Sequence, residues 1–94
     1  MHSQSRASYV IECYWPGVTE SAHALASDRV RRAAADLTRD GRRVRFVGSI
    51  MVPGEETVFC LLDGSEADVR VAGELAELPF ERVLASKRID GGEQ

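Results

Sequence analysis

The alternation of apolar and polar positions along the chain predicts four β-strands. The first is a run rich in β-branched and aromatic residues over Tyr9–Tyr14, which ends at a Trp-Pro-Gly turn. The other three cover Val44–Val52, Thr57–Leu62 and Arg82–Ile89. Thr57–Leu62 is apolar on both faces, which is typical of a central strand, whereas the polar residues of Arg82–Ile89 suit an edge strand.

Apolar residues at helical spacing predict one helix between the first two strands and another between the last two. In the first, Thr19 is a suitable N-cap and Gly41 a suitable residue to follow the helix end. Its apolar stripe is Ala22, Leu25, Ala26, Ala33, Ala34 and Leu37. The second begins with Ser65 and Asp68 as a capping pair and ends before Leu78-Pro79. Its stripe is Val69, Ala72, Gly73 and Ala76.

The order β-α-β-β-α-β predicts an α+β fold of the ferredoxin-like type, a four-stranded antiparallel sheet with both helices on one face. The opposite face would then expose Val10, Val47, Met51 and one side of Thr57–Leu62. Monomers rarely keep such an apolar patch, so we expect a homodimer in which two sheets pack face to face, as in a dimeric α+β barrel. A small ligand would fit between the sheets.

The length of 94 residues predicts a single domain over residues 9–89, with flexible tails at residues 1–8 and 90–94. A domain of this size buries only about 60 to 65 per cent of its unfolded surface, which also favours self-association.

The charge distribution argues against nucleic acid as a partner. The net charge is −3, and basic residues alternate with acidic ones except at Arg42, Arg43 and Arg45, a cluster that we expect to solvate a loop. No apolar segment approaches the length of a membrane span or a signal peptide, so a cytoplasmic protein without membrane contact is expected. Cys13 and Cys60 lack metal-site spacing and are predicted to be reduced core thiols.

Glu12 is the main candidate for ligand chemistry, because it interrupts an apolar strand on the side of Val10 and Tyr14. On the open sheet face its carboxylate could bind a ligand, act as a general base or contribute to a metal site. The alternative is an ion pair with Arg45 or another strand base.

Five other residues complete the predicted pocket. Tyr14 and Trp15 would line its mouth or else plug the edge of the core. Ser49 and Met51 share one parity of their strand with Arg45, so they are expected either in the cavity or in dimer packing. No catalytic residue is predicted: Cys60 has no histidine beside it, and His23 is expected to be an exposed helix residue.

Three segments carry a resemblance to a known family: YVIECYWPGVTE, VPGEETVFCLLDGSEADVR and LPFERV. In this order and spacing, over Tyr9–Ile89, the chain resembles the small actinobacterial proteins of the DUF4242 family, whose named members are nickel-binding proteins. The resemblance implies a ferredoxin-like dimer. Family members that bind metal carry a histidine in the second strand, just before a serine, whereas this chain has Gly48-Ser49. Nickel therefore loses an expected imidazole ligand here, and no cofactor is predicted.

Two functions from different classes follow from these observations. The first is a non-catalytic dimeric protein that holds a small ligand, or with less support a metal ion such as nickel, between its sheets. The alternative is a small α+β barrel enzyme, resembling a cofactor-independent oxygenase or a cyclase, that uses Glu12 in the sheet-face pocket. A dimer whose interface is completely filled would act only by contacting other proteins.

Overall fold

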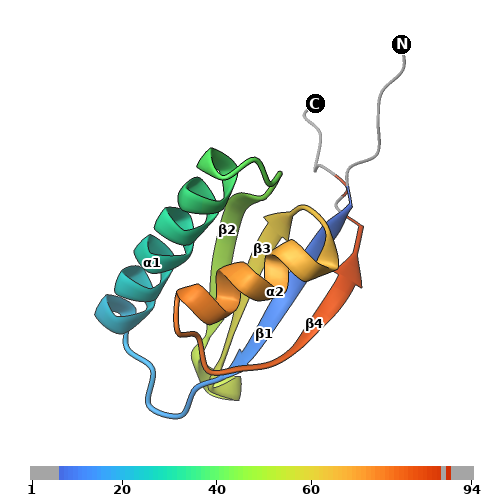
Figure 1. Cartoon of the computed structure of the whole chain (residues 1–94). Helices are drawn as coiled ribbons and strands as arrows, with labels where there is room; N and C mark the ends of the chain where they lie inside the picture. The colour runs from blue at the N-terminus through green and yellow to red at the C-terminus, as the bar shows by residue number, and fades with distance from the viewer. Residues whose placement is uncertain (1–6, 88, 90–94) are drawn as a thin grey trace, which may run out of the picture.

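The computed structural model describes residues 7–87 and 89, and it shows one layer of helices on one layer of sheet (Figure 1). The elements are β1 (Ser8–Tyr14), α1 (Glu20–Arg39), β2 (Arg45–Val52), a 3-10 turn η1 (Pro53–Glu55), β3 (Thr57–Asp63), α2 (Glu66–Leu75) and β4 (Phe80–Ser86). Both helices lie on the same face of the sheet.

The strand order is β2-β3-β1-β4, and all neighbouring strands are antiparallel. This is the ferredoxin-like arrangement, so the predicted fold is confirmed. Strands β1 and β3 occupy the centre of the sheet, while β2 and β4 form its edges. In the described part of the chain, neither helix has the length and apolarity to cross a bilayer.

Local signals in the sequence explain where the helices begin and end. The Thr19 hydroxyl accepts a hydrogen bond from the Ala22 amide, and the Ser65 hydroxyl accepts one from the Asp68 amide. Gly41 follows α1 with φ +93°, a left-handed conformation that glycine adopts without steric cost. Both predicted N-caps and the predicted helix end are therefore confirmed.

The core lies between the helices and the sheet. Its largest fully buried side chains are Ile11, Leu62, Val30, Val58, Val69, Cys13 and Cys60. The predicted stripe of α2 is buried throughout, but in α1 the prediction for Leu25 was wrong. Leu25 is 62% exposed, and Val30 is the large apolar residue that α1 buries.

Two strand boundaries differ from the prediction. Strand β1 begins at Ser8, which is buried and donates a hydrogen bond to Asp63 at 2.7 Å, so Ser8 belongs to the sheet and not to a tail. Strand β4 covers Phe80–Ser86 instead of Arg82–Ile89, because Phe80 already pairs with Cys13. Of the tails predicted at residues 1–8 and 90–94, residues 1–6 and 90–94 lie outside the described residues.

A β-bulge in β2 decides which of its residues face the helices. The pairing with β3 is Phe46 with Leu62 and then Gly48 with Leu61, so Val47 is the extra residue. Phe46 packs towards the helices before the bulge, and Ser49 and Met51 face them after it. The predicted placement of Ser49 and Met51 on the opposite face was therefore wrong, since a strict alternation cannot include the bulge.

Candidate functional site: the open face of the sheet

The sheet face opposite the helices is called here the open sheet face. Strand pairing arranges its residues in rows across β2, β3, β1 and β4. One row is apolar at every side chain: Gly48, Leu61, Val10 and Leu84. The next row is half apolar and half charged: Ile50, Phe59, Glu12 and Arg82. Val52, Thr57 and Tyr14 lie beyond it at one end, and Arg45, Asp63, Ser8 and Ser86 lie at the other.

Apolar side chains on this face are in contact with water. Ile50 is 64% exposed, Tyr14 51% and Leu84 37%. Val10, Phe59 and Leu61, which occupy the two central strands, are only half-buried. Scattered exposed apolar residues are ordinary, but a contiguous patch across four strands is typical of an interface or a ligand-binding surface.

Glu12 lies on the open sheet face, where the sequence predicted it. Its carboxylate accepts a hydrogen bond from the Arg82 guanidinium at 2.6 Å, and the two residues face each other across β1 and β4. Glu12 therefore forms the ion pair with a strand base that was the alternative to ligand chemistry. The base is Arg82 and not Arg45.

Arg45 is also on the open sheet face, at the polar end. Its guanidinium donates to Asp63 at 3.0 Å, and Asp63 also accepts from the Ser8 hydroxyl at 2.7 Å. Asp63 is only 3% exposed, so these contacts satisfy a carboxylate that would be costly to bury alone. Residues at the starts of β1 and β2 and at the end of β3 are thereby joined.

The two aromatic candidates have different surroundings. The Tyr14 hydroxyl donates to the Glu56 carboxylate at 3.3 Å, and the negative charge of Glu56 raises the pKa of Tyr14 above its ordinary value. Trp15 packs against the core at the edge of the sheet, and its backbone N–H donates to the Glu56 carbonyl at 2.6 Å. Tyr14 is therefore available to a ligand on the open sheet face, while Trp15 closes the core.

Gly48 leaves space in the apolar row. A Cβ atom built at this position would meet nothing within 4 Å. The strand neighbour of Gly48 is Leu61, so the space is bordered by an apolar side chain. The position at which the DUF4242 resemblance places a histidine thus lies on the open sheet face and has room for a ligand atom.

Ser49 belongs to a polar cluster on the other side of the sheet. Its hydroxyl lies 2.7 Å from His23 Nε2 and 2.8 Å from the Ser27 hydroxyl, both on α1. His23 is half-buried and not exposed as expected. The spacing of four residues between His23 and Ser27 places both on one face of the helix, which is the sequence signal for this cluster.

This cluster does not have the composition of a hydrolytic triad. Among the described residues, no carboxylate hydrogen-bonds to His23, and Ser49 is shared with a second hydroxyl. A nucleophilic serine needs a base that is oriented by a third group. We therefore interpret the cluster as a polar connection between α1 and β2.

The described side chains do not fit a nickel ion. No group of three or more histidine, cysteine, aspartate or glutamate residues comes together in the part of the chain that the structure describes. On the open sheet face the strand carboxylates Glu12 and Asp63 are engaged by arginines, and the imidazole of His23 is on the opposite side. Nickel prefers imidazole and other nitrogen ligands, which this face does not offer.

Both cysteines are expected to be unreactive in the folded protein. Burial raises the pKa of Cys60 to about 12 and that of Cys13 to about 11, with the charges of Glu12 and Glu81 adding to the effect at Cys13. The thiolate is the reactive species, so a disulfide reagent at pH 8 should label neither thiol until denaturant is added. Rapid labelling of the native protein would contradict the structure.

The same shifts predict alkaline destabilisation. Above pH 9 the thiols ionise in the unfolded chain but stay protonated in the folded one, so the free energy of unfolding falls as pH rises from 9 towards 11. Thermal unfolding measured over this range should show the loss. A Cys13→Ala, Cys60→Ala double variant should show a shallower dependence on pH.

Comparison with known proteins gives support for the fold. No protein-family model matches the chain, and no curated protein does. The fold is similar to that of SCO4226 from Streptomyces coelicolor A3(2), which is known from a crystal structure, with a TM-score of 0.63 and 22% sequence identity. The match covers 82% of this chain and 91% of that one. At this identity the similarity shows that the two chains share a fold.

Proposed function

We propose that the protein is a non-catalytic homodimer that holds a small, largely apolar molecule between two open sheet faces. The observation that carries the proposal is the apolar row Gly48, Leu61, Val10 and Leu84, which no element of the described chain covers. A second copy would remove this row from water, and the space above Gly48 would remain for a ligand. The resemblance to the dimeric DUF4242 family supports the same assembly.

Binding is favoured over catalysis by the state of Glu12. General acid–base chemistry needs a group that is free to exchange a proton with the substrate. Glu12 is already paired with Arg82, and the described residues place no histidine on this face. An ion pair beside an apolar row is better suited to orienting a polar group of a bound ligand. The reduced thiols Cys13 and Cys60 support a cytoplasmic location.

Native mass spectrometry of the purified protein, before and after addition of nickel, tests this function. A dimer that retains extra mass of an organic compound is the expected result. A dimer without extra mass would indicate that the interface is completely filled and that the protein acts by contacting other proteins. A monomer would contradict the proposal, and a dimer that takes up nickel would show that the second copy completes a metal site.

Glu12→Gln is expected to lower the fraction of dimer that retains ligand, because the amide pairs less strongly with Arg82 and with any polar ligand group. The dimer itself should persist. Glu66→Gln is the matched control, since Glu66 forms an ion pair with Arg70 on α2, away from the open sheet face. Equal retention in both variants would remove Glu12 from the binding site.

A further inference from the structure

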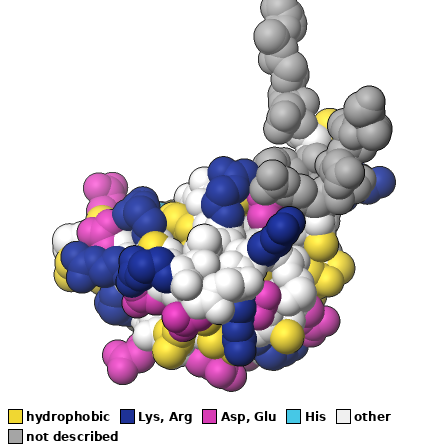
Figure 2. Space-filling model, turned by 45° about the horizontal axis from the view of Figure 1, so that its top comes forward, with side chains coloured by type: hydrophobic (Ala, Val, Ile, Leu, Met, Phe, Trp, Pro, Cys, Tyr) yellow, Lys and Arg dark blue, Asp and Glu magenta, His cyan; other side chains and the backbone are white. Residues whose placement is uncertain are grey.

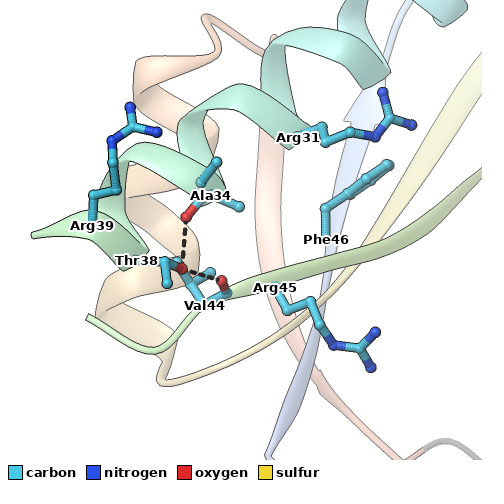
Figure 3. Close-up of a pocket in the computed structure, with 8 residues that line it drawn as sticks. Arg31, Ala34, Thr38, Arg39, Val44, Arg45 and Phe46 are labelled. Carbon is cyan, nitrogen blue, oxygen red and sulfur yellow. Dashed lines mark hydrogen bonds between the residues drawn. The ribbon is translucent and has the colours of Figure 1, made fainter. Parts of the chain in front are cut away.

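A second concave surface lies between α1 and the edge strand β2, on the helix side of the sheet. It is a cleft of about 540 Å³ (Figure 3), a volume within the range of small-molecule sites. Because it lies on the helix side of the sheet, its occupation does not depend on the open sheet face or on a dimer.

The floor of the cleft is apolar. It is formed by Ala34 of α1, by Val44 just before β2 and by Phe46 in β2. The Thr38 hydroxyl also lines it, but donates to the backbone carbonyls of Ala34 and Val44 at 2.9 and 3.0 Å (Figure 3). The floor therefore favours a flat apolar group that packs beside the Phe46 ring.

Arginine side chains surround this floor. The Arg31 guanidinium carbon lies 5.5 Å from the centroid of the Phe46 ring, and Arg39 extends from the next turns of α1 (Figure 3). Arg45 contributes its stem, while its guanidinium points away from the other two and binds Asp63. The guanidinium groups of Arg31 and Arg39 point apart in Figure 3, so they place positive charge at two ends of the cleft, and the Arg31 group is the one that lies over the Phe46 ring.

The charge around the cleft differs from that of the whole chain. Residues 29–45 hold seven of the twelve basic residues and only two of the fifteen acidic ones, so this segment has a net charge of +5 in a chain of −3. In Figure 2, dark-blue side chains group on the side of the molecule that carries α1. Such a local excess attracts anions.

We propose that this cleft binds an aromatic anion, a small molecule with a flat apolar body and one carboxylate or phosphate group. The body packs beside Phe46, and the anionic group accepts hydrogen bonds from Arg31, while Arg39 adds positive charge at the other end of the cleft. The planar guanidinium fork can donate two N–H groups to two oxygens of either a carboxylate or a phosphate. Arg31 already pairs with Asp28, and Arg39 with Asp36. These ion pairs are exposed, so they contribute little to stability, and they leave further N–H donors of both arginines free.

A peptide strand is a poorer occupant of this site. Strand addition needs regularly spaced backbone groups along an edge, and the bulge at Val47 interrupts them beside the cleft. The combination of a closed apolar floor and a charged mouth favours a compact ligand.

Amide chemical shifts in the ¹⁵N-labelled full chain test the proposal, with 1-naphthyl phosphate and 1-naphthoate as anionic probes and neutral 1-naphthol as the matched ligand. Both anions should shift the amides of Thr38, Val44 and Phe46 and should bind more tightly than naphthol. Arg31→Gln should weaken binding roughly five-fold, as expected for the loss of one exposed charge-assisted contact, and Arg39→Gln should weaken it by less.

Two further variants test whether binding depends on the cleft itself or only on the positive charge of α1. Arg32→Gln removes the same charge from an exposed position of α1 that does not line the cleft, and binding should be nearly unchanged. Ala35→Trp keeps every charge but fills the cleft from an exposed helix position, and binding should fall at least ten-fold.

The proposal is overturned if the shifts occur on the open sheet face instead, if Arg32→Gln weakens binding as much as Arg31→Gln, or if naphthol binds as well as the anions. Failure here would leave the dimer and its ligand unaffected, because native mass spectrometry measures those separately.

Discussion

Leu61→Lys is expected to convert the proposed dimer into a folded monomer. Leu61 lies on a central strand in the apolar row, between Val10 and Gly48, and its side chain points away from the core. In a face-to-face dimer, the new ammonium group would be buried in each copy without an acidic neighbour in its row. The penalty is several kcal/mol per buried ion, so the dissociation constant should rise by roughly a thousand-fold.

Sedimentation velocity measures this change directly, and circular dichroism shows whether the chain remains folded. Leu75→Lys is the matched control, because Leu75 is 57% exposed on α2 and lies on the other side of the molecule. The control should remain a dimer. A Leu61→Lys protein that stays dimeric would place the interface elsewhere.

Among the glycines that the structure describes, Gly64 is where a change to alanine is expected to cause the largest loss of stability. Gly64 has φ +144°, a conformation that other residues adopt only with strain. Its new Cβ would also lie 2.8 Å from the Arg43 carbonyl oxygen and 3.3 Å from Val44 Cα, both backbone atoms that cannot turn away. Strain and clash together should cost about 3 kcal/mol and lower the melting temperature by roughly 10 to 20 °C.

Gly54→Ala provides the comparison for this measurement. A Cβ at Gly54 would meet nothing within 4 Å, and this glycine does not need positive φ. Its effect should stay within about 0.5 kcal/mol in denaturant titration. Equal effects at the two glycines would mean that the close approach at Gly64 is relieved by movement of the chain around Arg43.

The sequence was sufficient to predict the fold because its local signals agree with one another. The caps at Thr19 and Ser65, the apolar stripe of α2 and the two-sided apolar pattern of β3 each indicate the same arrangement. The chain order then leaves few topologies to consider. For the same reason, the open sheet face and the position of Glu12 upon it could be predicted without the structure.

The rest of the site depends on contacts between distant segments. The partner of Glu12 is 70 positions away in the chain, and Arg82 could not be distinguished from other strand bases by pattern. Gly48 is a sign of the bulge, because a glycine within a strand often accompanies one, but the pattern does not show which neighbouring residue is the extra one. The cleft beside α1 arises only when the arginines of a helix are placed against the start of β2.

The bulge and the extra residue Val47 together set the face on which each later residue of β2 lies. Removing Val47 would leave Phe46 paired with Leu62 and Gly48 with Leu61, so Ser49 and Met51 would still face the helices along a strand without the bulge. A β2 strand that kept Val47 but lost the bulge would instead turn Ser49 and Met51 outward and Gly48 and Ile50 towards the helices. Relatives of this chain that lack the bulge should therefore have one residue fewer between the positions of Phe46 and Gly48.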